Sequence, residues 1–560
     1  MNLKIIFLFI CSFLMAVILV VGQDVEAINK KNLFQINGSL NLGYWVYNAS
    51  GIEDRQNPVG WYIAGAPNIT VAGINMPFTA IISDQERSFS QPFNQMGISP
   101  YYKWVKLHVG YRNMSFSEFT LGGATFLGAG IELTPGKFRF AAFYGRFRRR
   151  IENDTTVPYP VLPSYERWGY GAKLGLGGKK GFFDLIYMHS SDRPKSDDLE
   201  LQTLKPEDNI ALGMNMERLV FKKLNFGLNL AASVFTSNTF SKEMRIDSIK
   251  GFEKYGFLNN MMAINFTTTI KFAGSAFLQL KLKNMSLKFS YRHVEPGYFS
   301  HGAYFLQDDL QQYLTSANFS LFKQKVIIGA SGGLQFNNLD KTKAATSKRT
   351  IASLNLMFLP GAGISIGLTY ANFGTTMLSS ALQMNDSIYM SIVNQNIGLN
   401  TSYSWSKTNF VHQLGLNSMF TKVDDRNEFT RAFTRNDILF NSVSYNLGIN
   451  KIQLNAGVGL SYTILNSYNS EVTVPGLQAN VRKMFFKKTM SLSLTYNIQK
   501  RTVNQADDGD IQTITTDLKY TLKKKNTFSI GFTQTLNNSS AITSRTFNEN
   551  RIRLQYGYIF

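Results

Sequence analysis

Apolar and polar side chains alternate along most of this chain. Between residues 33 and 47 the even positions from Phe34 to Val46 are mainly apolar, whereas the odd positions from Gln35 to Asn41 are polar. The same alternation returns in residues 224–234, 452–464 and 490–498. A period of two residues is that of a β-strand, because successive side chains point to opposite faces of the sheet. The pattern therefore predicts an all-β fold whose strands have one apolar and one polar face.

The lengths of strands and connectors favour a membrane barrel over a soluble β-sandwich, whose strands also alternate. Residues 266–282 hold an apolar residue, Thr or Gly at every even position. This run is far longer than the usual soluble strand of about five or six residues. Short connectors, as at 221–223, alternate along the chain with long ones, as at 237–261. Short turns at one end and long loops at the other are typical of a transmembrane β-barrel.

We expect a transmembrane antiparallel up-and-down barrel of about 24 strands, within a range of roughly 20 to 26. The count falls to about 22 if residues 66–83 and 103–113 do not span the membrane. Residues 48–115 are the irregular part, because the connector at 84–102 is long while the turn at 113–115 is short, the reverse of the order elsewhere. This segment is a candidate for insertion into the lumen.

The C-terminus carries the strongest resemblance to a known class of protein. Apolar and aromatic residues occupy every second position from Ile552 to the final Phe560. Such an end resembles the closing strand of Gram-negative outer-membrane β-barrels, and the alternative is an ordinary edge strand. The resemblance implies that Tyr556, Tyr558 and Phe560 form the assembly signal and that the barrel-assembly machinery is a partner. In a closed barrel this strand pairs with the first one and leaves no free edge.

Residues 1–22 have the pattern of a signal peptide. Lys4 precedes an apolar run from Ile5 to Val21, and Gly22 is a small residue at a cleavage site. The alternative is a membrane anchor, for which the run is short. Cys11 is the only cysteine and lies inside this segment, so the mature chain is expected to contain no disulfide. Residues 23–560 are expected to form a single outer-membrane barrel domain, because no linker or change of character interrupts them.

Charge is distributed unevenly between the two kinds of connector. The whole chain carries a formal net charge of +21. Most short turns contain Lys, whereas much of the acid lies in long loops, for example at Asp197, Asp308 and Asp507. Two explanations remain open: lysines that only solubilise hairpin tips, or lysines that lie at the phosphate level of the inner leaflet.

Two groups of cations are candidate binding residues. By alternation, Lys271, Lys281, Lys288 and Arg292 face the lumen, where they either favour anions or pair with loop carboxylates. Arg146, Arg148, Arg149 and Arg150 crowd the end of one strand. Guanidinium groups bind phosphate in pairs, so this cluster either contacts lipopolysaccharide or forms a solvated rim.

A barrel of this width needs something in its lumen. About 16 to 18 strands already leave a water channel, and about 22 enclose a lumen that is plugged. We expect the lumen to be filled or gated by inserted loops, by residues 48–115, or by a separate plug or lipoprotein partner. TonB-dependent receptors carry a long N-terminal plug, and the first expected strand here begins too early for one.

The sequence thus predicts an outer-membrane protein that forms a large, plugged or gated transport or translocation pore, in contact with lipid and lipopolysaccharide. The alternative is a structural or assembly component with a blocked lumen. No catalytic, cofactor-binding or metal-binding residues are expected: the five histidines are scattered, and Asp507–Asp510 lack the other ligands of a calcium loop. The basic charge is spread over turns rather than gathered in one patch, so nucleic acid is not an expected partner.

Overall fold

The chain forms a single closed antiparallel β-barrel. The computed structural model describes residues 34–84, 94–152, 163–194, 204–245, 256, 259, 261–262, 264–343, 345–379, 391–427, 430–540 and 545–560. The predicted signal peptide therefore lies outside the described residues. The segments of the sheet follow one another around the wall in the following order: β1 Phe34–Asn37, β2 Ser39–Ser50, β3 Val59–Gly65, β4 Asn68–Val71, β5 Ile74–Ser83, β6 Gln95–Ile98, β7 Tyr101–Tyr102, β8 Val105–Ser115, β9 Gly122–Leu133, β10 Phe138–Arg148, β11 Glu166–Gly178, β12 Gly181–Arg193, β13 Asp208–Val220, β14 Leu224–Thr236, β15 Thr268–Lys281, β16 Met285–Val294, β17 Leu310–Leu321, β18 Val326–Phe336, β19 Ala345–Gly361, β20 Ile364–Ser379, β21 Ser391–Lys407, β22 Phe410–Asp425, β23 Asn436–Ile449, β24 Leu454–Ser467, β25 Ser470–Phe485, β26 Met490–Val503, β27 Ala506–Leu522, β28 Asn526–Asn538 and β29 Phe547–Ile559.

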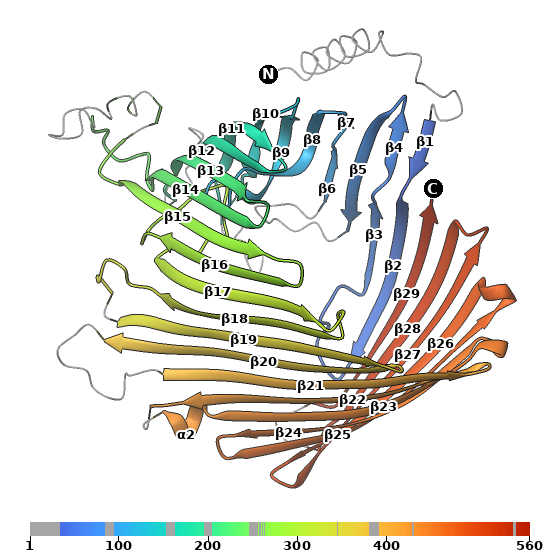
Figure 1. Ribbon diagram of the computed structural model, residues 1–560. Helices are drawn as coiled ribbons and strands as arrows, with labels where there is room; N and C mark the ends of the chain where they lie inside the picture. The colour runs from blue at the N-terminus through green and yellow to red at the C-terminus, as the bar shows by residue number, and fades with distance from the viewer. Residues whose placement is uncertain are drawn as a thin grey trace.

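These 29 segments make 26 strands across the wall. Three pairs of neighbouring segments, β1 with β2, β3 with β4 and β6 with β7, continue each other as single strands. The ring closes where β2 pairs with β29, from Ser39 opposite Ile559 to Ser50 opposite Asn548. Figure 1 shows this seam, with the first and last strands side by side. The predicted pairing of the C-terminal strand with the first strand is confirmed.

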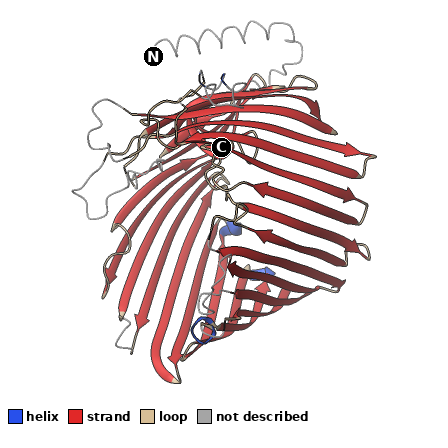
Figure 2. Ribbon diagram, turned by 90° about the vertical axis from the view of Figure 1, so that its left-hand side faces the viewer, coloured by secondary structure: helices blue, strands red, loops and turns tan. Residues whose placement is uncertain are grey.

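Each strand presents an apolar outer face and a different inner face. On β24, Val458, Leu460 and Tyr462 are exposed on one side, and Gly459 and Ser461 lie on the other. The exposed apolar side chains continue onto neighbouring strands as an outer belt, which is the surface that hydrocarbon requires. Within the described residues, strands make up nearly all of the regular structure, and helix is confined to short pieces such as α2, Arg431–Thr434 (Figure 2). Among the described residues, no helix has both the length and the apolar character needed to cross a membrane.

The two ends of the barrel differ in their connectors. Twelve short turns lie at one end, together with the start of β1 and the C-terminus, and none of these turns holds an acidic residue. Several turn positions adopt left-handed backbone, for example Phe221 at φ 51° and Lys222 at φ 58°. Most long loops lie at the opposite end, although β24–β25 and β26–β27 are joined there by two residues each. The predicted alternation of short turns and long loops is thus confirmed, with these two exceptions.

The described part of residues 48–115 belongs to the wall, which corrects the expectation of a lumen insertion. Within this segment β3 pairs with β2 and β5, and β6 pairs with β5 and β8. The single strand expected at 66–83 is a hairpin, and a further strand at 95–102 was missed, so the barrel has two strands more than the expected 24. Both misreadings have the same cause: Pro67 and Pro100 interrupt the hydrogen-bond ladder and the alternation within one strand.

The outer belt leads to a stability prediction. Leu460→Arg places a guanidinium on the lipid face, and we expect it to destabilise the barrel by about 2–4 kcal/mol if the residue lies near the bilayer midplane. The neighbouring Ser461→Arg points into the lumen and is expected to be tolerated. Equilibrium unfolding of both variants in lipid vesicles measures the difference. Equal destabilisation by the two variants would show that the faces are assigned wrongly.

Candidate functional site

Two loops from the long-loop end fold onto the inner wall of the barrel. We call them together the lumen insert: residues 116–121, between β8 and β9, and residues 295–309, between β16 and β17. They bind each other through backbone and side-chain contacts. Ser300 Oγ donates to Thr120 O at 2.7 Å, Tyr298 Oη donates to Phe119 O at 2.8 Å, and Gly122 N donates to Gly302 O at 2.9 Å.

The lumen insert is seated on apolar side chains that face inward. Phe119 and Tyr298 form one buried cluster with Ala231, Ala273 and Val294, which are inward positions of β14, β15 and β16. A second cluster spreads over the inner faces of β8 to β13; its members are Met114, Phe116, Leu121, Ala124, Phe126, Ala141, Phe143, Phe147, Ile186, Met188 and Ala211. This arc of the lumen is therefore dry where the insert covers it, since buried apolar surface of this kind excludes water.

Gly302 lets the two loops approach closely. A Cβ atom at this position would lie 2.4 Å from Thr120 O and 2.7 Å from Met188 Sδ. Such distances are shorter than any van der Waals contact, so a side chain at residue 302 would push the insert away from the wall.

Polar contacts fix the longer loop to the wall. His301 is fully buried, and its Nδ1 accepts a hydrogen bond from Ser190 Oγ at 2.7 Å while its Nε2 donates to Glu207 Oε2 at 3.1 Å. The His301 backbone N donates to Asn209 Oδ1 at 3.1 Å. Because the Glu207 carboxylate can only accept, the Nε2–H form is the one of the two neutral tautomers that satisfies both ring nitrogens, and these two bonds fix the ring orientation.

A buried ion pair supports this anchor from behind. Arg167 donates from Nε and Nη2 to the two carboxylate oxygens of Asp192 at 2.7 and 2.9 Å, and from Nη2 to Glu207 at 2.5 Å. The side chains of Arg167 and Asp192 are 2% and 1% exposed. Arg148 adds a second guanidinium to Asp192 at 3.0 Å. Glu207 thus connects His301 of the insert to the ion pair between Arg167 on β11 and Asp192 on β12.

The surroundings shift the pKa values of two loop groups. Burial, helped by the charge of Arg167, lowers the pKa of His301 to about 4, against the opposing carboxylates of Glu207 and Asp192. Burial alone raises the pKa of Glu207, but the hydrogen bond from His301 and the charge of Arg167 outweigh it and lower the pKa to about 2. At neutral pH the anchor therefore contains a neutral histidine and a charged glutamate.

These pKa values predict that acid loosens the lumen insert. The folded pKa of His301 lies below its ordinary value of 6.5, so the released loop binds a proton that the seated loop does not. Seating is therefore strongest above pH 6.5 and weakens by roughly 3 kcal/mol as the pH falls toward 4. Glu207, with its lowered pKa, causes a further loss of seating free energy only below about pH 4.5.

Protease accessibility of residues 295–309, measured against pH, should rise between pH 6.5 and 4. In His301→Gln the part of the rise between pH 6.5 and 4 should disappear, and a rise that persists there would contradict the role of His301.

Ser190, His301 and Glu207 have the residue types of a hydrolytic triad, but their placement does not suit one. Ser190 and His301 are 1% and 0% exposed, so Ser190 Oγ cannot reach a substrate carbonyl. The three residues hold the insert in place, and sequence reasoning did not bring them together. Among the described residues, no group of three potential ligands is arranged to hold a metal ion.

The inner wall of the remaining arc, from β18 to β29, is polar. Its inward positions are mainly Asn, Gln, Ser, Thr and Gly, and exposed examples are Asn400, Asn455 and Gln478. A cavity of about 240 Å³ on this arc is lined largely by small polar residues of β20 to β23, such as Ser402 and Ser442. Such a surface binds water through hydroxyl and amide groups rather than excluding it.

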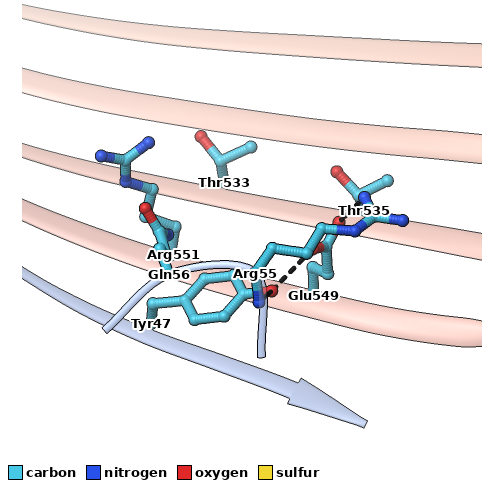
Figure 3. Close-up of a pocket in the computed structure, with 7 residues that line it drawn as sticks. All are labelled: Tyr47, Arg55, Gln56, Thr533, Thr535, Glu549 and Arg551. Atoms are coloured by element: carbon cyan, nitrogen blue, oxygen red, sulfur yellow. Dashed lines mark hydrogen bonds and ion pairs between the residues drawn. The ribbon is translucent and has the colours of Figure 1, made fainter. Parts of the chain in front are cut away.

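At the seam the inner wall becomes aromatic and cationic. A cavity of about 270 Å³ is lined by Tyr47, Arg55, Gln56, Thr533, Thr535, Glu549 and Arg551 (Figure 3). Within it Glu549 accepts hydrogen bonds from Tyr47 Oη at 2.7 Å and from Arg55 Nη1 at 3.2 Å. A smaller cavity of about 140 Å³ shares Arg551 and adds Trp45, Tyr62, Arg553 and Gln555. A signal for this site was available in the sequence: Trp45 and Tyr47 are aromatic, whereas the preceding odd positions of the strand, from Gln35 to Gly43, are polar or small.

The four lysine and arginine residues predicted to face the lumen all occupy inward positions. Lys271 lies beside Gly297 of the insert, with its Cε 3.8 Å from the place of a Cβ there. Arg292 pairs with Glu118 of the insert at 3.3 Å. Lys288 lies 4.5 Å from the ring centroid of Phe277, and Lys281 is at the short-turn end, opposite Ser286. Arg292 thus takes the second of its two expected roles, pairing with a loop carboxylate. The pairing does not test the anion preference of the group.

The arginine cluster at the end of β10 is divided by a bulge between Arg146 and Arg148. Arg146 pairs with Glu166 at 3.2 Å, and Arg150 lies 3.6 Å from Glu152. Arg148 turns to Asp192, and Arg149 is half-buried. A role in lipopolysaccharide binding stays a prediction for this cluster.

The three residues of the predicted assembly signal lie at the closing end of the chain. Tyr556 Oη donates to Asn526 Oδ1 at 2.7 Å, and the rings of Tyr558 and Phe560 meet edge to face with centroids 5.0 Å apart. These contacts place the residues at the seam; their role in assembly stays a prediction.

Comparison with known proteins gives only distant structural likeness. No family model and no curated protein matches the chain. Among solved structures, the translocation pore of the P pilus usher PapC is similar at 10% identity and a TM-score of 0.38, over 94% of this chain and 100% of that one. The outer membrane protein OpdK from Pseudomonas aeruginosa follows at 11% and 0.32, over 68% and 99%. OccAB2 of Acinetobacter baumannii has values of 8% and 0.30, over 68% and 97%. These values are too low to support an argument about function.

Proposed function

We propose that this protein is an outer-membrane channel whose lumen is water-filled along β18 to β29 and narrowed by the lumen insert along β8 to β17. The single observation that carries the proposal is the contrast between the two arcs. One arc is apolar and covered by residues 116–121 and 295–309, and the other exposes amides and hydroxyls. An apolar arc without its cover would be unfavourable in a water-filled pore, so the cover and the channel belong together.

The insert has the features of a gate rather than of a fixed wall strand. It reaches the wall from loops, its polar anchor consists of a few side chains, and a buried histidine couples it to pH. A signal peptide at residues 1–22 and lipopolysaccharide around the long-loop end fit this proposal and stay predictions.

A second candidate function is a scaffold that docks a partner at the short-turn end. It is favoured by the composition of that rim, where turn lysines occur without any acidic residue. Phe221, Phe322 and Phe486 lie among these lysines and are 87%, 74% and 71% exposed. An acidic plug or lipoprotein would complement such a rim by charge.

Conductance in planar bilayers tests the channel. The wild-type protein is compared with a variant in which residues 297–308 are replaced by a short Gly-Ser linker. The expected result is a stable open level for the wild type and a higher level for the variant, because the insert no longer occupies the lumen. Insertion of the same linker into the outer turn at residues 468–469 is the matched control and should leave the wild-type level unchanged. If neither the wild type nor the variant with the linker conducts, the channel proposal is wrong and the scaffold function is favoured.

A further inference from the structure

We propose that the seam binds an acidic oligosaccharide on the inner wall, with sugar rings against Trp45 and Tyr62 and carboxylates on Arg551 and Arg553. The proposal rests on the channel function, because the ligand must enter the lumen to reach this wall. It adds a substrate class to that function. The evidence consists of two aromatic rings, two guanidinium groups and the cavities that connect them.

The two rings lie flat against the wall because glycines face them. Trp45 is opposite Gly60 on β3, and Tyr62 is opposite Gly43 on β2. A Cβ at either glycine would lie 2.1 Å from a ring atom of its partner. Each ring therefore covers a glycine with one face and turns the other toward the lumen, and the ring centroids lie 6.4 Å apart. Flat, immobile aromatic faces are suited to the apolar faces of sugar rings, because little side-chain entropy is lost on binding.

The inward position of Trp45 is exceptional for this chain. All five tryptophans lie in the described residues. Trp61, Trp168 and Trp405 are on lipid-facing positions and Trp104 is in a short turn. A tryptophan on the lumen face is not needed to anchor the barrel in a bilayer, so a different role explains it better.

Two guanidinium groups flank the rings. Arg551 lies over the Trp45 ring, 6.0 Å from its centroid, and Arg553 follows at the next inward position of β29. Arg553 Nη2 lies 3.8 Å from Asp517 Oδ1, and both side chains are more than 40% exposed. Arg551 Nε and Trp45 Nε1 are buried and have no hydrogen-bond partner in the described structure. Arg551 lines the smaller cavity, so an anion there would be held by the terminal nitrogens of its guanidinium, which binds carboxylates through two parallel hydrogen bonds.

The shape of the site indicates a chain rather than a small ion. The cavities of about 140 and 270 Å³ share Arg551 and follow β29 along the wall. Successive inward residues of a strand are about 7 Å apart, so Arg551 and Arg553 present two positive charges at this separation beside the aromatic faces. An oligosaccharide with a carboxylate on each ring offers the matching sequence of charges and apolar faces. A neutral sugar would leave the guanidinium groups unused, and an inorganic anion would leave the rings unused.

Calorimetry on the purified barrel in detergent tests the site. The probe is tetragalacturonate, with neutral maltotetraose and the ring-free anion citrate as comparisons. We expect tetragalacturonate to bind more tightly than either. Arg551→Gln and Trp45→Leu should each weaken its binding about tenfold to a hundredfold, the range expected when a charge-assisted hydrogen bond or a stacked face is lost. Arg482→Gln removes an exposed inward guanidinium on β25 and is the matched control, with no change expected.

The outcomes separate this proposal from the channel itself. Binding in detergent needs no open pore, so a closed barrel that binds tetragalacturonate would overturn the channel and keep the site. Equal binding of tetragalacturonate and citrate, or an effect of Arg482→Gln as large as that of Arg551→Gln, would overturn the site. Mobility shift on heating, recorded for each variant, confirms that the barrel is folded before its affinity is compared.

Discussion

Deleting residues 551–560 is expected to abolish the folded barrel. The deletion removes most of β29, whose residues pair with β2 on one side and β28 on the other. Two long strand edges would then face hydrocarbon, and each unsatisfied backbone group there costs several kcal/mol. Circular dichroism in detergent and the mobility shift on heating should both show the loss. If the truncated variant still refolds into a barrel whose mobility shifts on heating, pairing of β29 with β2 is not required to close the structure.

The variant Phe560→Ala distinguishes the role of the last strand in closing the barrel from the role of the terminal ring in assembly into the outer membrane. The backbone N of Phe560 donates to Gly38 O at 3.1 Å, a bond that alanine retains, and the ring contacts Tyr558. We therefore expect the variant to refold in detergent like the wild type and to accumulate less in the outer membrane of cells. Normal accumulation would mean that the terminal ring is not the assembly signal, and that the resemblance to other closing strands extends only to their shape.

The wall of this barrel was largely predictable because hydrocarbon imposes a simple rule on it. Leu460 and its neighbours on β24 must be apolar outward, and the turn at Phe221–Lys223 must be short, whatever the protein does inside. The closing role of β29 could be predicted for the same reason, since a barrel with a free edge would be exposed to lipid.

The inside of the barrel was less predictable because contacts between distant loops fill it. The alternation of side chains predicts a strand over residues 116–134, and the connector at 295–312 is predicted to be an outer loop. Neither pattern reveals that Gly302 meets Thr120. One signal was present: Phe143, Phe147, Ile186 and Met188 make the inward faces of β10 and β12 apolar, which a water-filled lumen does not explain. Strands that are apolar on both faces of a wide barrel indicate a covering segment.

The buried charges behind the insert give the second large effect. Arg167→Met leaves Asp192 and Glu207 without their shared guanidinium, while only Arg148 still reaches Asp192. Breaking a buried ion pair from one side costs about 3–5 kcal/mol, because the remaining charge has lost its compensation. We expect a loss of this size in the free energy of unfolding. We also expect faster proteolysis within 295–309, because Glu207 no longer holds His301 in place.

The triple variant Arg167→Met, Asp192→Asn, Glu207→Gln is the control for that result. It removes both carboxylate charges together with the Arg167 guanidinium and leaves Arg148, whose side chain is 26% exposed, as the remaining charge of the network. Replacing a buried charge network is often close to neutral. Most of the lost stability should therefore return, whereas the pH dependence of the insert between pH 6.5 and 4 should change, because His301 then faces uncharged partners. If the triple variant is as unstable as Arg167→Met, packing of the long arginine side chain supports the wall, and the charge network does not control the insert.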